Sequence, residues 1–96
     1  MADAPKRVNV REYLKENAEL QERRLREKEP LVSKGDWTHH RRLGMAELVA
    51  GLTRNTEELF DMANASPLPD ADAVAKQVAD LCNWACFLGL RLRGKD

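Results

Sequence analysis

The hydrophobic positions of this chain follow helical spacing in three segments that prolines and glycines separate. In the first segment, residues 9–29, Asn9 and Glu12 form a pair typical of a helix N-terminus, and apolar positions then recur every three or four residues. Pro30 ends the segment because proline cannot continue a helix. The apolar stripe is narrow and lies among many Arg, Lys and Glu residues. We therefore expect an arm that packs on a partner helix; the alternative is a solvated helix held by i,i+4 ion pairs.

The second segment, residues 38–65, has the most regular helical pattern. Its apolar stripe fits the i, i+3, i+4, i+7 template and consists of Met45, Leu48, Val49, Leu52, Leu59, Phe60 and Ala63, with Thr56 in line. Asp36 is a suitable cap for a start as early as Trp37. Pro67 and Pro69 end the segment. The pattern predicts one continuous helix.

The third segment, residues 70–92, begins at Asp70, and Asp72 lies in a first turn that favours acidic side chains. Between Val78 and Leu90 it is apolar on nearly every side, which is typical of a central, buried helix. Gly94 closes the segment among cationic residues that suit a helix C-terminus.

Together these patterns predict an all-α protein. With 96 residues the chain is expected to form one domain, 1–96, with a charged helical arm over 1–33 and a helical core over 34–96. Three helices leave the third with more apolar surface than one chain can cover. We therefore expect the bundle to be completed by homo-oligomerisation, as a homodimer or a larger assembly.

Charge is balanced overall but unevenly distributed. The chain has 16 Lys and Arg against 16 Asp and Glu; residues 1–42 are net basic, 43–90 net acidic and 91–96 net basic. Zero net charge argues against nucleic acid as a partner. The two cysteines are too few for a disulfide framework. The N-terminal residues 1–10 are polar and lack the apolar region of a signal peptide, and no apolar stretch is long enough for a membrane span. These features predict a soluble, cytoplasmic protein.

Asp80 and Asn83 are the only polar side chains between Val78 and Leu90, and Lys76 precedes Asp80 by one turn. A buried carboxylate is costly unless it is paired, hydrogen-bonded or bound to a metal. One interpretation is that Asp80 pairs with Lys76 or with a neighbouring helix. The other is that this edge faces a polar cavity that holds a cation or a ligand.

The second segment carries Glu57, Glu58 and Asp61. Glu58 and Asp61 are three residues apart and share a helix face, so they could jointly hold a divalent cation. That face lies nearly opposite the apolar stripe, and the alternative is a solvated acidic face. The pattern leaves both interpretations open.

In these acidic positions the chain resembles the MazG-type all-α nucleotide pyrophosphohydrolases. Their signature is Glu-x-x-Glu, a spacer, and Glu-x-x-Asp; this chain has Glu58-Leu-Phe-Asp61 and then Gln77-Val-Ala-Asp80. Asn83-Trp-Ala-Cys-Phe-Leu follows, much like a run in the family, and Lys34-Gly-Asp-Trp37-Thr-His is similar to the segment before the family's first acidic helix. The resemblance covers roughly residues 34 to 92. Gln77 departs from it because the family has Glu there, and Lys76 replaces another frequent acid.

The resemblance implies a helical fold and a function. It implies Mg²⁺ held by the acidic set Glu57, Glu58, Asp61 and Asp80, and a catalytic role for the last three of these residues. For nucleotide binding it implies the set Lys34, Trp37, Lys76 and Asn83. The metal would activate a water that attacks between the α- and β-phosphates of a nucleoside triphosphate.

Gln77 and Lys76 weaken that implied metal site, so two functions remain as hypotheses. The first is a small MazG-like protein that binds, and in its active form hydrolyses, nucleotides with Mg²⁺. The alternative is a catalytically inactive helical oligomer, a regulatory protein that sequesters nucleotides or binds a protein partner; so small and divergent a chain would suit a phage origin.

Overall fold

A computed structural model describes residues 9–28 and 39–94 of the chain. Four helices account for 84% of these residues, and no strand occurs among them. The helices are α1 (Val10–Lys28), α2 (His39–Arg42), α3 (Met45–Ala63) and α4 (Ala71–Leu92). The predicted all-α class is confirmed, with three long helices that pack together.

The first and third predicted helices are found close to their expected ends. The Asn9 side chain caps α1: its Oδ1 accepts from the Glu12 backbone N–H at 2.8 Å. Asp70 caps α4 in the same way and accepts from the Ala73 N–H at 2.8 Å. Both caps satisfy N–H groups that the first helical turn leaves without partners.

The second predicted helix, 38–65, is wrong as one continuous element. The chain forms the single turn α2, leaves the helical conformation at Gly44, and starts again as α3. Glu47 accepts a hydrogen bond from the Gly44 N–H at 3.1 Å, which supports the new start. Gly44 weakens a helix interior because it carries the largest backbone entropy cost, and the break falls there. The predicted early start at Asp36 and Trp37 lies outside the described residues.

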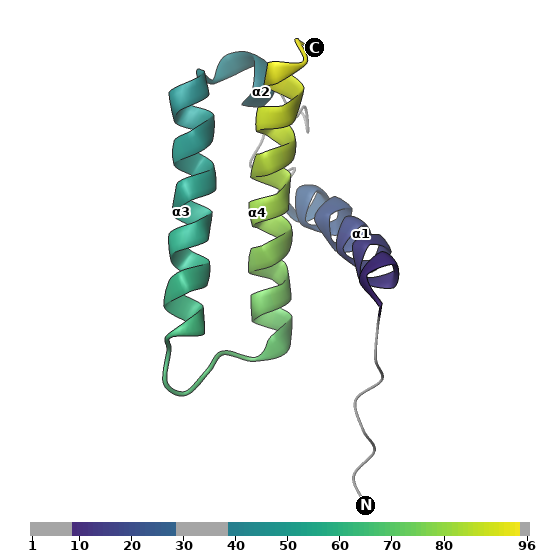
Figure 1. Cartoon of the computed structure of the whole chain (residues 1–96), viewed down its shortest axis with the longest axis vertical. Helices are drawn as coiled ribbons and strands as arrows, with labels where there is room; N and C mark the ends of the chain where they lie inside the picture. The colour runs from purple at the N-terminus through teal and green to yellow at the C-terminus, as the bar shows by residue number, and fades with distance from the viewer. Residues whose placement is uncertain (1–8, 29–38, 95–96) are drawn as a thin grey trace, which may run out of the picture.

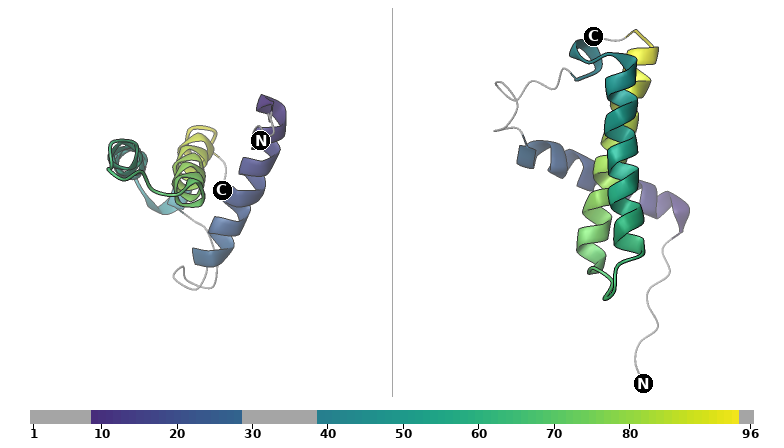
Figure 2. Two further views of the ribbon diagram at one scale, coloured as in Figure 1. Left: turned by 90° about the horizontal axis from the view of Figure 1, so that it is seen from below. Right: turned by 90° about the vertical axis from the view of Figure 1, so that its left-hand side faces the viewer.

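α3 and α4 run antiparallel side by side, and α1 crosses α4 on the side away from α3 (Figure 1, Figure 2). α2 lies over the C-terminal end of α4. The predicted central helix is therefore α4, since α1, α2 and α3 all contact it. None of the described helices is long and apolar enough to cross a membrane.

The hydrophobic core is small. Leu48, Ala79 and Phe87 are the only apolar side chains of the described residues that are buried. The Trp84 ring packs so closely on α3 that a Cβ at Gly51 would overlap it. His39 stacks on Phe87 with ring centroids 4.9 Å apart, which ties α2 to the end of α4. Much of what a domain of this size normally buries is exposed here.

Candidate functional site

Asp80 is the most informative polar residue, and it lies between α4 and α1. Its side chain is 9% exposed. Arg24 binds it with two parallel hydrogen bonds, Nε to Oδ1 at 3.0 Å and Nη2 to Oδ2 at 2.9 Å. Lys28 adds an ion pair to Oδ2 at 3.2 Å. Of the interpretations that the sequence left open, the structure shows pairing with a neighbouring helix.

These contacts decide the protonation state of Asp80. Burial alone would raise the pKa of its carboxyl, but the hydrogen bond from Arg24 and the charge of Lys28 outweigh burial and lower the pKa below its ordinary value. Arg24 responds in the opposite direction, and its pKa is raised by the Asp80 hydrogen bond. Asp80 is thus an anion that two cations already neutralise.

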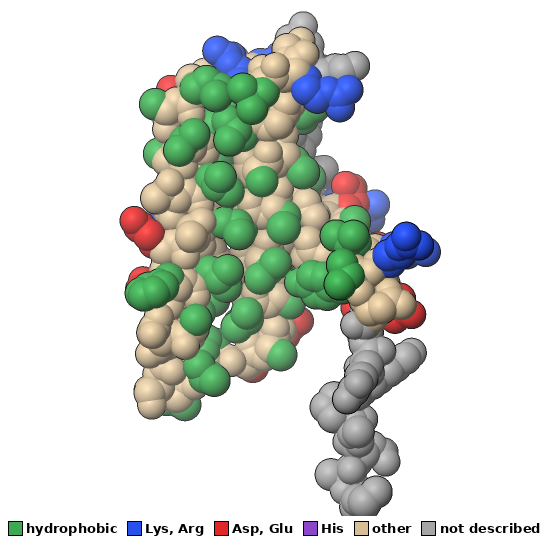
Figure 3. All heavy atoms as spheres, viewed as in Figure 1, with side chains coloured by type: hydrophobic (Ala, Val, Ile, Leu, Met, Phe, Trp, Pro, Cys, Tyr) green, Lys and Arg blue, Asp and Glu red, His purple; other side chains and the backbone are tan. Residues whose placement is uncertain are grey.

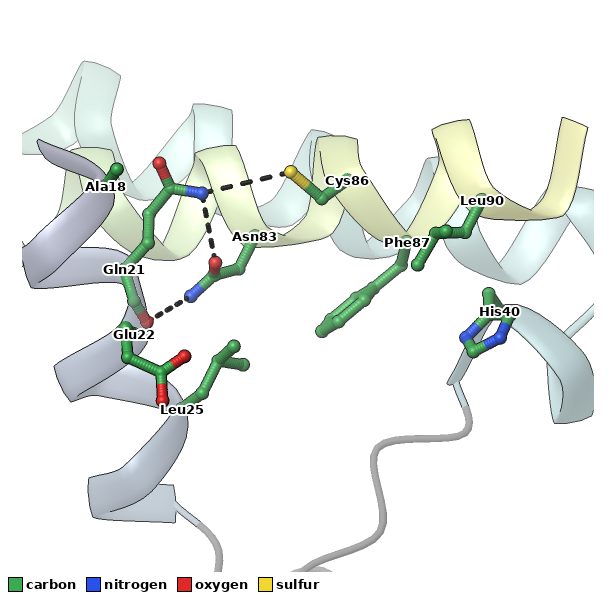
Figure 4. A pocket seen from close by; sticks show the side chains of 9 residues that line it. All are labelled: Ala18, Gln21, Glu22, Leu25, His40, Asn83, Cys86, Phe87 and Leu90. Carbon is green, nitrogen blue, oxygen red and sulfur yellow. Dashed lines mark hydrogen bonds between the residues drawn. The ribbon is translucent and has the colours of Figure 1, made fainter. Parts of the chain in front are cut away.

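The same contact surface continues along both helices as a polar seam. We define the α1–α4 seam as Asn17, Gln21, Arg24 and Lys28 of α1 with Asp80, Cys82, Asn83 and Cys86 of α4. Gln21 and Asn83 bind each other twice: Gln21 Nε2 donates to Asn83 Oδ1 at 3.1 Å, and Asn83 Nδ2 donates to the Gln21 carbonyl at 3.1 Å (Figure 4). Asn17 Nδ2 donates to the Cys82 sulfur at 3.5 Å. Asn83, expected at a nucleotide, is therefore engaged by α1.

A second polar cluster joins α3 to α4 at Gln77. Its Nε2 lies 3.1 Å from Asn55 Oδ1, 3.1 Å from the Asn55 carbonyl and 3.0 Å from Glu58 Oε2. Asn55 and Gln77 are both buried. The pair on α3 that meets Gln77 is thus Asn55 and Glu58, one turn earlier than the Glu58–Asp61 pair expected from the acidic pattern. Gln77, an amide where the resemblance implies a carboxylate, is thus bound by a second amide, Asn55.

The remaining expected site residues lie apart from these clusters. Glu57 and Asp61 are exposed on α3, and neither side chain has a hydrogen bond or ion pair within the described residues. Lys76 pairs with Asp72 at 3.4 Å, an exposed i,i+4 contact. Lys34 and Trp37 fall outside the described residues.

The acidic set implied for Mg²⁺ does not come together. Among residues 9–28 and 39–94, no three His, Cys, Asp or Glu side chains lie close enough to share a metal ion. Both oxygens of Asp80 already accept from Arg24, and Glu58 accepts from Gln77. A hard cation requires free oxygen ligands, so the donor set of this arrangement does not fit it. We derive no metal-assisted step from it.

A cavity of about 360 Å³ opens between α1, α2 and α4 (Figure 4). Its walls are Ala18, Gln21, Glu22, Leu25, His40, Asn83, Cys86, Phe87 and Leu90. His40 is 8% exposed, and its Nε2 has no hydrogen-bond partner among the described residues. The neighbouring His39 has a lowered pKa because burial and the charges of Arg42 and His40 disfavour its cationic form. The polar groups of Gln21 and Asn83 are turned toward each other rather than toward the cavity.

Sequence reasoning missed the α1 half of the seam and missed Asn55. Asn17, Gln21, Arg24 and Lys28 recur at intervals of four, three and four residues, a helical spacing as regular as any apolar stripe. That polar periodicity is the signal that could have revealed them. Asn55 carried no such signal, because a search for acids passes over an amide.

Three comparisons bear on this site. A scan against protein-family models, a search of curated proteins and a search of solved structures each returned no match.

Proposed function

We propose that this protein is a non-catalytic helical protein that acts by binding another polypeptide chain, the alternative function left open by its sequence. The observation that carries this proposal is the double hydrogen bond and the ion pair by which Arg24 and Lys28 hold Asp80. A carboxylate used in this way stabilises the packing of α1 on α4. It is not available to a metal or to a reacting water.

Two further features support a binding role. Gln77 is a buried amide between α3 and α4, and its bonds to Asn55 and Glu58 lock the two helices together. Among the described residues, nine large apolar side chains are exposed while only three apolar residues are buried. Exposed apolar surface of this extent favours contact with another chain.

The test is a hydrolysis assay on the 96-residue chain. Pyrophosphate and phosphate release would be measured for a panel of nucleoside triphosphates with Mg²⁺ and with Mn²⁺. Asp80→Asn removes the carboxylate, and Gln77→Glu supplies the acid that the resemblance implies at that position. We expect no turnover by the natural chain or by either variant.

Turnover by the natural protein that Asp80→Asn abolishes would overturn the proposal and establish the pyrophosphohydrolase instead. Titration calorimetry with the same nucleotides separates the two forms of the alternative. Absence of binding supports a role through protein contacts, whereas tight binding without turnover would replace that role with nucleotide sequestration.

A further inference from the structure

One face of the α3–α4 hairpin is apolar and open. We define the open face as Met45, Val49 and Phe60 of α3 together with Val78, Ala85, Gly89 and Leu92 of α4. Hydrophobic side chains cover this side of both helices in the space-filling view (Figure 3). Phe60 is 68% exposed and Leu92 is 69% exposed. At 100° per residue, the α3 members lie roughly 120° around the helix from the positions that contact α4.

That offset explains why the most regular apolar stripe of the sequence stays largely exposed. Leu48 and Gly51, at one edge of the stripe, are buried on the α4 side. Met45, Val49 and Phe60 point along the free side of the hairpin. The charged residues Arg54 and Asp61 lie roughly 100° or more around α3 from these three, and Glu57 lies beside Phe60 at the edge of the open face.

Two glycines in the hairpin differ in how much space surrounds them. Gly51 is required within the monomer, because a Cβ there would overlap the Trp84 ring. A Cβ built at Gly89 would meet no atom within 4 Å from any other described part of the molecule. Glycine weakens a helix relative to alanine, so Gly89 costs stability without any packing reason among the residues that the structure describes. A glycine at position 89 would be explained if the backbone of another chain packs closely against α4 there.

The open face contains both halves of a self-complementary contact. Bulky side chains, with Phe60 the most exposed of them, form a ridge on α3. Ala85 and Gly89 on α4 are small residues one helical turn apart, and we call this part of the open face the groove because it carries no large side chain. A two-fold interface requires the same patch on both partners, so that the ridge of each copy fits the groove of the other. No member of the open face is charged, so two copies meet without like-charge repulsion.

The first turns of α1 extend this surface. Val10, Tyr13 and Leu14 are 75%, 44% and 61% exposed. They lie on the same face of α1 as the residues of the seam. They come before the seam in the chain, in the part of α1 that projects past the hairpin (Figure 2). α1 thus adds an apolar wall at the edge of the open face (Figure 3).

We infer that the open face is the interface between two copies of this chain. The inference rests on the proposed function, since it names the polypeptide that the protein binds first. Together the exposed parts of the large side chains on α1, α3 and α4 amount to on the order of 700 Å², close to the ~800 Å² that each partner contributes to a stable interface. A typical monomer exposes an apolar patch of only about 300–600 Å².

The experiment measures the mass of the full chain in solution by light scattering and its dissociation constant by analytical ultracentrifugation. Phe60→Asp places a charge on the ridge, and Gly89→Leu fills the groove. Asp61→Ala, on the same helix as Phe60 but on the charged side, is the matched control. We expect a species of twice the 10.9 kDa chain mass, weakened at least roughly tenfold by each open-face variant and unchanged by the control.

Both open-face variants should fold, because Phe60 is mostly exposed and the space around Gly89 is open in one chain. Far-UV circular dichroism checks this point. A monomer at high micromolar concentration, or a dimer that neither variant weakens, would overturn the inference and leave the proposed function standing. Nucleotide turnover would overturn the proposed function and leave the dimer intact, so the two failures are distinguishable.

Discussion

Helix α4 is held on its two long sides by different kinds of contact. On the α3 side, Leu48 is fully buried and the Trp84 ring lies directly on Gly51. On the α1 side, the seam consists of amides, thiols and the ion pairs of Asp80. One contact depends on shape and apolar burial, the other on hydrogen bonds and charge.

The difference teaches how the two parts of the molecule respond to change. Apolar packing involves no titrating group and so depends little on pH, but it is weakened when a side chain is shortened. A buried ion pair is nearly neutral in net energy when complete, yet removing one partner leaves an uncompensated charge. We therefore expect α3 and α4 to unfold together, whereas α1 should be able to detach from α4 while the hairpin stays folded.

The largest effect is expected at Leu48, which has no exposed surface. Leu48→Ala leaves a cavity between α3 and α4 and should lower the free energy of unfolding by about 3 kcal/mol. Urea denaturation followed by circular dichroism measures this loss. Leu68→Ala is the matched control: the same atoms are removed from a side chain that is 70% exposed, and the change should stay within about 0.5 kcal/mol. Equal effects of the two variants would show that α3 and α4 do not share a packed core.

A smaller and more local effect is expected at Asp80. Asp80→Asn keeps the size of the side chain but removes the carboxylate that pairs with Lys28 and leaves Arg24 with the more exposed Glu27 as its anionic partner, at a cost of about 2 kcal/mol. Hydrogen exchange should quicken along α1 while α3 remains protected. Asp72→Asn, which removes the exposed partner of Lys76, should change the free energy of unfolding by less than about 0.5 kcal/mol. Uniform loss of protection across all helices would contradict separate release of α1.

The contrast between these two sides also shows which features of the fold are readable from the sequence. The positions of the three long helices follow from local spacing and from caps such as Asn9 and Asp70, all within a few residues of each other. The break at Gly44 follows from the same local chemistry, but the strong apolar pattern on either side favoured continuity. Because helix spacing and caps involve only neighbouring residues, the sequence predicted the three long helices well.

The site was less predictable because its contacts join distant parts of the chain. Asp80 meets Arg24 across 56 positions, and no spacing rule on α4 selects that partner over Lys76. Gln77 contacts Asn55 and Glu58 because of the way in which α3 and α4 are aligned. A search of the sequence for paired acidic residues cannot predict that alignment. The exposure of Met45, Val49 and Phe60, which belong to the same apolar stripe as the buried Leu48, is likewise a tertiary outcome.

The smallest expected effect is the pH dependence of the α1–α4 seam. The pKa of Asp80 is lower in the folded protein than in the unfolded chain, so its ion pairs contribute stability above the unfolded pKa, near 4, and lose it as the pH falls through the folded pKa. Other carboxylates titrate in the same range, so the useful quantity is the difference in free energy of unfolding between the natural protein and Asp80→Asn. This difference should be constant above about pH 5 and should shrink below about pH 4, because a protonated Asp80 no longer pairs with Arg24. A difference that stays constant down to pH 3 would mean that the carboxylate charge does not hold α1, and the seam would then depend on its amides.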